Sequence, residues 1–96
     1  MREDAIKYIA NHYGVIHQSN KAIEEMSELT KALCKIKEHP AFDPRVSRYL
    51  DDVIEEIADV SIMTEQLKHL YGAKEVDAVI ERKLARQMRR IKIGGD

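Results

Sequence analysis

The sequence predicts an all-α fold, a bundle of about four helices in a single domain spanning residues 1–96. Apolar residues recur at intervals of three and four along most of the chain, and no segment alternates like a strand. The two prolines and four glycines fall between the periodic segments or at the end. A hydrophobic content of 44% with 34% charged residues is typical of a folded helical protein rather than a disordered one.

The first two helices are predicted on either side of Gly14. Ile6, Ile9 and Tyr13 repeat at helical spacing over residues 2–13, and Gly14 is a typical C-terminal stop. A longer second helix is expected over residues 16–38, ending at His39-Pro40. Its expected apolar seam is made by Ala22, Met26, Leu29, Leu33 and Ile36.

The third and fourth helices are predicted over residues 44–71 and 74–91. Asp43-Pro44 supplies an N-cap and a proline at the first helical position, and Gly72 ends the third helix. The third helix is expected to bury a seam of Val46, Leu50, Val53, Ile57, Val60, Thr64, Leu67 and Tyr71. The fourth carries Val76, Ile80, Leu84, Met88 and Ile91 on one side.

Size and composition limit the classes of function. A 96-residue domain buries only about 60 to 65% of its unfolded surface, so we expect a homodimer or homotetramer. A net charge of −1 gives no general attraction to nucleic acid or to an anionic membrane, and no segment has the roughly 20 apolar residues of a membrane span. The single cysteine, Cys34, has no internal disulfide partner, which favours a reducing cytoplasm.

An acidic pattern occurs twice in the chain. AIEEMSEL at residues 22–29 and VIEEIADV at residues 53–60 place three carboxylates in the same register against apolar neighbours. Because a helix turns about 100° per residue, Glu25 and Glu28 flank the seam of the second helix, and Glu56 and Asp59 flank that of the third. If the two seams pack together, these four carboxylates converge on one small volume.

Clustered carboxylates raise one another's pKa values unless a cation lies among them. Mg²⁺ or Mn²⁺ suits carboxylate oxygens, and Mg²⁺ commonly completes its shell with substrate phosphates. Lys83, Arg86 and Arg90 form a basic flank on the fourth helix that suits phosphate binding. Two other interpretations remain open, a solvated charged face and a salt-bridge network between helices of a non-catalytic interaction module.

The residues Glu24-Glu25-x-x-Glu28, a gap of 27 residues, and Glu56-x-x-Asp59 resemble the motif of the MazG-like all-α nucleoside triphosphate pyrophosphohydrolases. The segment IERKLARQ, residues 80–87, is similar to the basic final helix of that family, and the resemblance covers residues 14–91. It implies hydrolysis of the bond between the α and β phosphates of a nucleoside triphosphate. The products would be a nucleoside monophosphate and pyrophosphate.

The resemblance also implies roles for individual residues. Glu25, Glu28, Glu56 and Asp59 would bind Mg²⁺, and Lys83 and Arg86 would contact the triphosphate. Further expected phosphate ligands are Arg90 and Lys21, the latter one turn before Glu25. Glu24 and Glu55, which the helical phase turns toward solvent, are the candidates for the general base. A phosphoribosyl nucleotide is an alternative substrate on the same fold.

Overall fold

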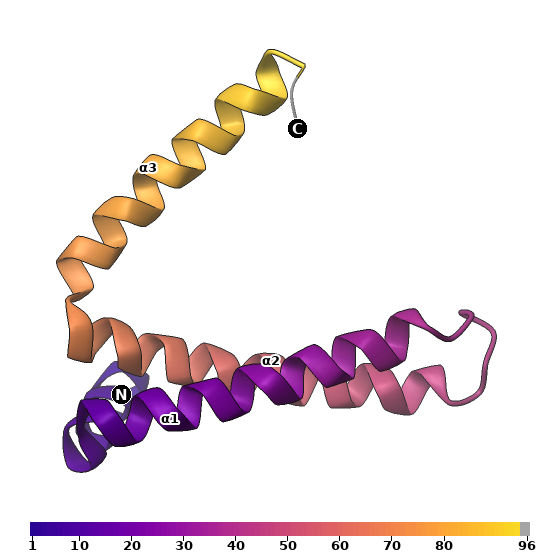
Figure 1. The fold of residues 1–96 in the computed structure, drawn as a ribbon, viewed down its shortest axis with the longest axis horizontal. Helices are drawn as coiled ribbons and strands as arrows, with labels where there is room; N and C mark the ends of the chain where they lie inside the picture. Colours follow the sequence, from indigo (N-terminus) through magenta and orange to yellow (C-terminus); the bar gives the residue numbers. More distant parts are fainter. Residues whose placement is uncertain (95–96) are drawn as a thin grey trace.

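The structure is a computed structural model that describes residues 1–94, and it is all-helical over that range. It contains three helices, α1 (Arg2–Lys37), α2 (Val46–Tyr71) and α3 (Ala73–Lys92). Helices α1 and α2 lie side by side as an antiparallel hairpin, and α3 leaves the far end of α2 and diverges from it (Figure 1). The all-α prediction is confirmed over the described residues, which form three helices where the sequence predicted about four.

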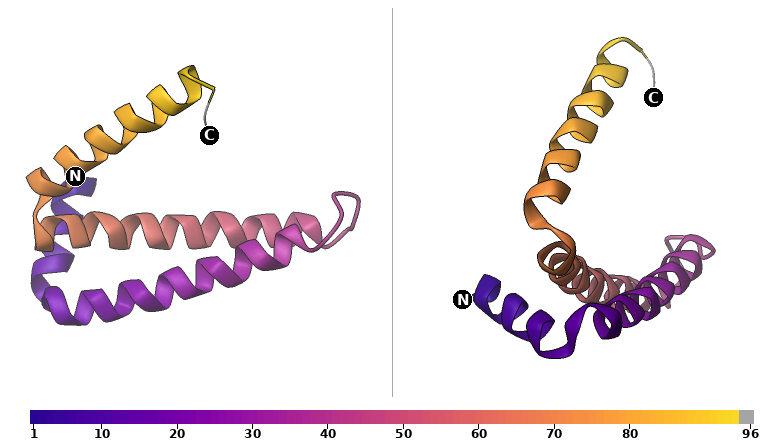
Figure 2. Two further views of the ribbon diagram at one scale, coloured as in Figure 1. Left: turned by 45° about the horizontal axis from the view of Figure 1, so that its top comes forward. Right: turned by 60° about the vertical axis from the view of Figure 1, so that its left-hand side comes forward.

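The difference in helix number arises at Gly14. This residue has φ 86° and ψ 171°, which is not helical, so the regular helix is interrupted there and continues beyond it without a loop. The break predicted at Gly14 is therefore present, and α1 consists of two helical segments that meet at a sharp kink. As Figure 2 shows, the kink turns the first segment of α1 across the hairpin. Asn11 on that segment is tied to α2 by a 2.9 Å hydrogen bond with His69.

The start of α2 also differs from the prediction. The helix begins at Val46 rather than at Pro44, so Pro44 lies in the turn and not at the first helical position. Asp43 stabilises the turn before α2, because its Oδ1 accepts a 2.8 Å hydrogen bond from the backbone N–H of Arg45. The Arg45 guanidinium pairs with the same carboxylate at 2.8 Å. Together these contacts fix the turn that leads into α2.

Small and polar side chains form the centre of the seam between α1 and α2. Ala10 and Ala22 are completely buried, which lets the helices approach closely. Nearby, the buried Gln18 donates from Nε2 to Oε1 of the buried Gln66 at 2.6 Å. Val53 and Met63, both buried, contribute apolar area from α2. The buried amide pair is consistent with the rule that polar groups inside a protein find hydrogen-bond partners.

The seam agrees with the expected one only in part. Ala22, Leu29 and Ile36 of the predicted seam are buried or half-buried, whereas Met26, Leu33 and Ile57 are 40%, 46% and 48% exposed. The small Ala22 permits close contact with α2, and the larger Met26 and Leu33 lie beside the contact rather than in it. As a result Glu25 and Glu56 lie at the edge of the seam and are half-buried.

A single residue, Gly72, connects α2 to α3 along the chain. The φ of Gly72 is 137°, and a Cβ there would lie 2.8 Å from Oε1 of Glu75, so both backbone and space favour glycine. Lys68 Nζ and Asp77 Oδ1 form a 2.7 Å ion pair across this joint. Beyond it, α3 has no buried residue and no packing contact with α1 among the described residues. No described helix is long and apolar enough to cross a membrane.

Candidate metal centre

A shallow cavity opens on one face of the α1–α2 hairpin, which we call the acidic face. Its volume is about 270 Å³. The cavity is lined by Glu28, Lys31, Ala32, Lys35, Asp52, Glu55 and Glu56. Four of these seven side chains are carboxylates, and three of the four, Glu28, Glu55 and Glu56, come from the two copies of the acidic pattern. The antiparallel packing of α1 and α2 therefore brings together residues that lie about thirty positions apart in the sequence.

Three carboxylates at the edge of this cavity lie close enough to share a cation. One oxygen each of Glu25, Glu56 and Asp59 lies within 4.8 Å of the others. Opposite ligands of an octahedral Mg²⁺ are separated by about 4.2 Å, twice its oxygen distance. A small rotation of the side chains would thus bring the three oxygens into a coordination shell. The sequence predicted all three residues as metal ligands.

Glu56 is the carboxylate most affected by this arrangement. Its Oε2 is buried and has no hydrogen-bond partner among the described residues. Partial burial and the negative charges of Asp59, Glu25, Glu28 and Glu55 raise the pKa of Glu56, with burial the largest cause. An unpaired buried carboxylate oxygen costs free energy that a proton or a cation would recover. The donor set, three carboxylates with one orphaned oxygen, fits a hard divalent cation.

Lys21 lies directly beside this group. Its Nζ is 3.4 Å from Glu25 Oε1 and 3.7 Å from Glu24 Oε1. The two carboxylates raise the pKa of Lys21, with the charge of Glu24 the largest cause. Glu24 is exposed and lies outside the group of three, as its helical phase predicted. Lys21 therefore places one positive charge at the edge of the group of three carboxylates.

Glu28 and Glu55 line the cavity but do not belong to the group of three carboxylates. Glu28 is paired with Lys31 at 3.4 Å, and its charge contributes to the raised pKa of Glu56. The helical phase predicted that Glu55 points toward solvent. Glu55 is exposed, and it also lines the cavity. A ligand role for Glu28 would require it to leave Lys31.

The sequence prediction assigned no functional role to three charged residues of the cavity, Asp52, Lys31 and Lys35. Asp52 lies four residues before Glu56, and the two lysines lie three and seven residues after Glu28. Helical spacing of three, four and seven places all of them near the acidic pattern. The three residues could therefore have been identified from their spacing in the sequence.

The basic residues of α3 are not brought to this cavity in the single chain. Lys83 and Arg86 line a separate cavity of about 250 Å³ with Arg82, Ala85 and Arg89. Among the described ion pairs none involves Lys83, Arg86 or Arg90. Since α3 does not contact α1, the basic flank and the acidic face lie apart within one copy. No salt-bridge network within the described chain joins them.

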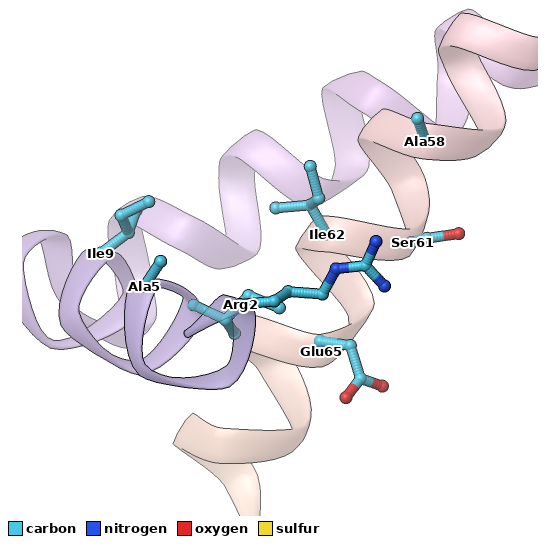
Figure 3. Close-up of a pocket in the computed structure, with 8 residues that line it drawn as sticks. Arg2, Ala5, Ile9, Ala58, Ser61, Ile62 and Glu65 are labelled. Carbon is cyan, nitrogen blue, oxygen red and sulfur yellow. The ribbon is translucent and has the colours of Figure 1, made fainter.

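A larger and more apolar cavity, of about 340 Å³, lies between the first segment of α1 and α2. It is lined by Arg2, Ala5, Ile6, Ile9, Ala58, Ser61, Ile62 and Glu65. Figure 3 shows the Arg2 side chain extending across it toward Ser61. One residue that lines it, Ala58, directly precedes Asp59 of the candidate metal centre in the sequence.

Comparisons with protein-family models, with curated proteins and with solved structures found no match to this chain.

Proposed function

We propose that this protein is a Mg²⁺-dependent nucleoside triphosphate pyrophosphohydrolase. It would cleave an NTP or dNTP between the α and β phosphates to give a nucleoside monophosphate and pyrophosphate. The observation that carries the proposal is the convergence of Glu25, Glu56 and Asp59, one oxygen each within 4.8 Å, with Glu56 Oε2 buried and unpaired. The resemblance of the doubled acidic motif to MazG-like enzymes supplies the substrate class.

Glu25, Glu56 and Asp59 would hold the cation, with Glu28 joining them when it releases Lys31. Mg²⁺ or Mn²⁺ bound there would supply positive charge to the phosphate oxygens and lower the pKa of the attacking water. Water adds to the α phosphorus as the bond to the β phosphate breaks, and pyrophosphate leaves. Glu55 on the cavity wall, or Glu24 at its edge, would accept the proton from the water.

The phosphate chain carries several negative charges and needs cations besides the metal. Lys21 Nζ lies 3.4 Å from Glu25 Oε1, and it would contact a phosphate oxygen next to the bound metal. Lys83, Arg86 and Arg90 would contact the distal phosphates when an α3 helix lies near the acidic face. Removing Lys21 is therefore expected to affect the reaction at the α phosphate, and removing Lys83 or Arg86 mainly substrate binding.

The test is a panel of nucleoside triphosphates incubated with the full chain and Mg²⁺. Release of pyrophosphate and nucleoside monophosphate is expected, and omission of metal should abolish it. Phosphoribosyl nucleotides belong in the same panel, because they share the phosphate chemistry. No turnover of any member with either Mg²⁺ or Mn²⁺ would refute the proposal and favour a non-catalytic interaction module.

Variants connect the reaction to the site. Glu25→Gln and Glu56→Gln each remove a metal ligand and should lower kcat/KM by at least about 100-fold, the scale typical of a lost catalytic interaction. Glu65→Gln is a matched control on α2, because Glu65 is more than half exposed and pairs only with Lys68 at 3.6 Å. Equal losses in all three would show that the group of three carboxylates is not the site.

A further inference from the structure

The cavity between the first segment of α1 and α2, which we call the apolar cavity, has the size and lining of a small-molecule site. Its volume is about 340 Å³, and ligand pockets range from roughly 300 to 1,000 Å³. Ile6, Ile9 and Ile62 give it large apolar side chains, and the small Ala5 and Ala58 leave space between the two helices. Ile9 and Ile62 are 38% and 45% exposed, so part of their apolar surface is free to be covered by a flat ring.

One face of α2 connects the apolar cavity to the candidate metal centre. Glu55, Asp59 and Ile62 follow one another at intervals of four and three residues, so they lie on the same face of the helix. Glu55 lines the cavity of the acidic face, Asp59 belongs to the group of three carboxylates, and Ile62 lines the apolar cavity. The helix rises only about 4.5 Å from Asp59 to Ile62. The group of three carboxylates therefore lies between the two cavities along this face of α2.

Positive charge lies in the opposite direction along the hairpin. Lys31 and Lys35 line the cavity of the acidic face. Because α1 and α2 are antiparallel, these lysines lie beside the part of α2 that precedes Glu56. Lys35 reaches as far as Tyr49, with its Nζ 5.6 Å from the centre of the ring. The two lysines are thus on the side of the carboxylates away from the apolar cavity.

Arg2 is the cation of the apolar cavity. Figure 3 shows its side chain extending across the cavity toward Ser61. Among the described residues Arg2 forms no ion pair, so its guanidinium is available to a ligand. The carboxylate of Glu65 points away from Ile62 in Figure 3 and pairs with Lys68 at 3.6 Å, so we assign it no contact with the ligand.

A guanidinium selects among bases because it donates hydrogen bonds and accepts none. Guanine and hypoxanthine, which are 6-oxopurines, offer two acceptors on one edge, O6 and N7. Adenine has an amino group in place of the carbonyl, and cytosine also presents an amino group. The Arg2 side chain therefore favours a 6-oxopurine.

We infer that the apolar cavity binds the base of the substrate, a 6-oxopurine held by Arg2, and that the phosphate chain extends from the metal centre toward Lys31 and Lys35. Charged phosphate oxygens lose free energy in an apolar cavity and gain it beside an ammonium group, so the reverse orientation is disfavoured. Lys31 pairs with Glu28 in the free protein at 3.4 Å, and it becomes available to a phosphate when Glu28 turns to the metal. This inference rests on the proposed function, because the metal centre is what places the α phosphate between the two cavities.

The test compares kcat/KM for GTP, ITP, ATP and methyl triphosphate, which has no base. Ala5→Leu fills the apolar cavity and should lower the value about 10- to 100-fold for the three nucleotides, leaving methyl triphosphate unchanged. Arg2→Met should lower it about tenfold or more for GTP and ITP and leave ATP unchanged. Lys7→Met is the matched control, because Lys7 is a cation of the same segment that pairs with Glu3 at 3.2 Å. It should leave all four values unchanged.

The direction of the phosphate chain has its own signature. Replacing both Lys31 and Lys35 with methionine should lower kcat/KM by the same factor for all four substrates, because the triphosphate is common to them. A loss confined to the nucleotides, or no loss, would overturn the assignment of the phosphate chain to these lysines.

The failure of this inference differs from the failure of the proposed function. A wild type that hydrolyses GTP and ATP equally well, or an Ala5→Leu variant with unchanged nucleotide rates, would overturn the inference and leave the reaction standing. A wild type that cleaves none of the triphosphates would refute the proposed reaction. Guanosine then tests the cavity alone, since it contains no phosphate for the metal. Saturation-transfer NMR should detect guanosine on the wild type and not on Ala5→Leu or Arg2→Met, and equal signals or no signal on all three would overturn the inference.

Discussion

Glu25 on α1 and Glu56 on α2 face each other at the edge of the hairpin seam, with one oxygen of each and one of Asp59 within 4.8 Å. The two glutamates occupy the same position in the two copies of the acidic pattern. Their repulsion is part of the reason that the pKa of Glu56 is raised. The repeated sequence therefore places like charges together in a position that water reaches only in part.

Divalent metal is expected to raise the melting temperature of the protein. A cation bound by Glu25, Glu56 and Asp59 stabilises only the folded state, by about 2.7 kcal/mol at a hundredfold excess over its dissociation constant. Glu56→Gln should abolish most of this rise. In chelator the same variant should be at least as stable as the wild type, because one of the mutually repelling charges is gone. Thermal unfolding with and without Mg²⁺ measures both effects.

Glu65→Gln is the control for that measurement, since it lies on the same helix outside the group of three. It should keep the full response to Mg²⁺. If Glu56→Gln responds to metal as strongly as Glu65→Gln, the cation is bound elsewhere. A response to Mg²⁺ that Na⁺ reproduces at equal ionic strength would point to screening rather than to coordination.

Asp43 gives a prediction for acid stability. Hydrogen bonds from the side chain and backbone of Arg45 lower the pKa of Asp43 from 3.8 to about 2. A lowered folded pKa means that the contribution is present above pH 3.8 and is lost as the pH falls toward 2. Asp43→Asn should therefore be less stable than the wild type at pH 5, and the difference should shrink between pH 4 and pH 2. Urea unfolding at several pH values tests this, and a constant difference would contradict it.

The buried pair Gln18 and Gln66 allows a double-mutant cycle with methionine at both positions. Gln18→Met leaves Oε1 of Gln66 without the donor that lies 2.6 Å away, and should cost about 1–3 kcal/mol in the free energy of unfolding. Replacing both glutamines with methionine removes the unpaired group and should cost less than the sum of Gln18→Met and Gln66→Met. Additive losses would show that the two amides do not act as a pair.

The positions of the helices could be predicted because their signals are local. Gly14 and Gly72 mark the kink and the joint, and both have a positive φ that glycine adopts readily. The direction in which the chain continues after each glycine was not predictable. Helix α3 has no buried residue in one chain. The periodicity of its apolar residues therefore does not identify the surface that it covers.

The seam was predicted only in part, for a physical reason. Ala22, Leu29 and Ile36 were expected in it and are buried or half-buried, whereas the large Met26 and Leu33 were also expected in it and are exposed. Close packing favours the smaller side chain, and Gln18 is drawn into the seam with it by its hydrogen bond to Gln66. Glu25 and Glu56 still converge as expected, because a rotation of both helices in the same sense keeps these two residues on one side of the hairpin.

The kink at Gly14 gives the last prediction. Its φ of 86° and ψ of 171° lie in a region open almost only to glycine, while a Cβ would meet nothing within 4 Å. Gly14→Ala should thus lower the free energy of unfolding by about 1–3 kcal/mol through backbone strain alone. Gly94→Ala is the matched control, because Gly94 has φ 84° and equally open space but follows the last turn of α3, where the backbone can relax.

Relief of the strain at residue 14 would straighten α1 and separate its first segment from α2. The 2.9 Å hydrogen bond between Asn11 and His69 would then be lost, and so would the cavity that Ile62 lines. Hydrogen exchange should show residues 2–13 less protected in Gly14→Ala and unchanged in Gly94→Ala. Unchanged protection together with unchanged stability in Gly14→Ala would mean that the kink is not required to hold the first segment of α1 against the hairpin.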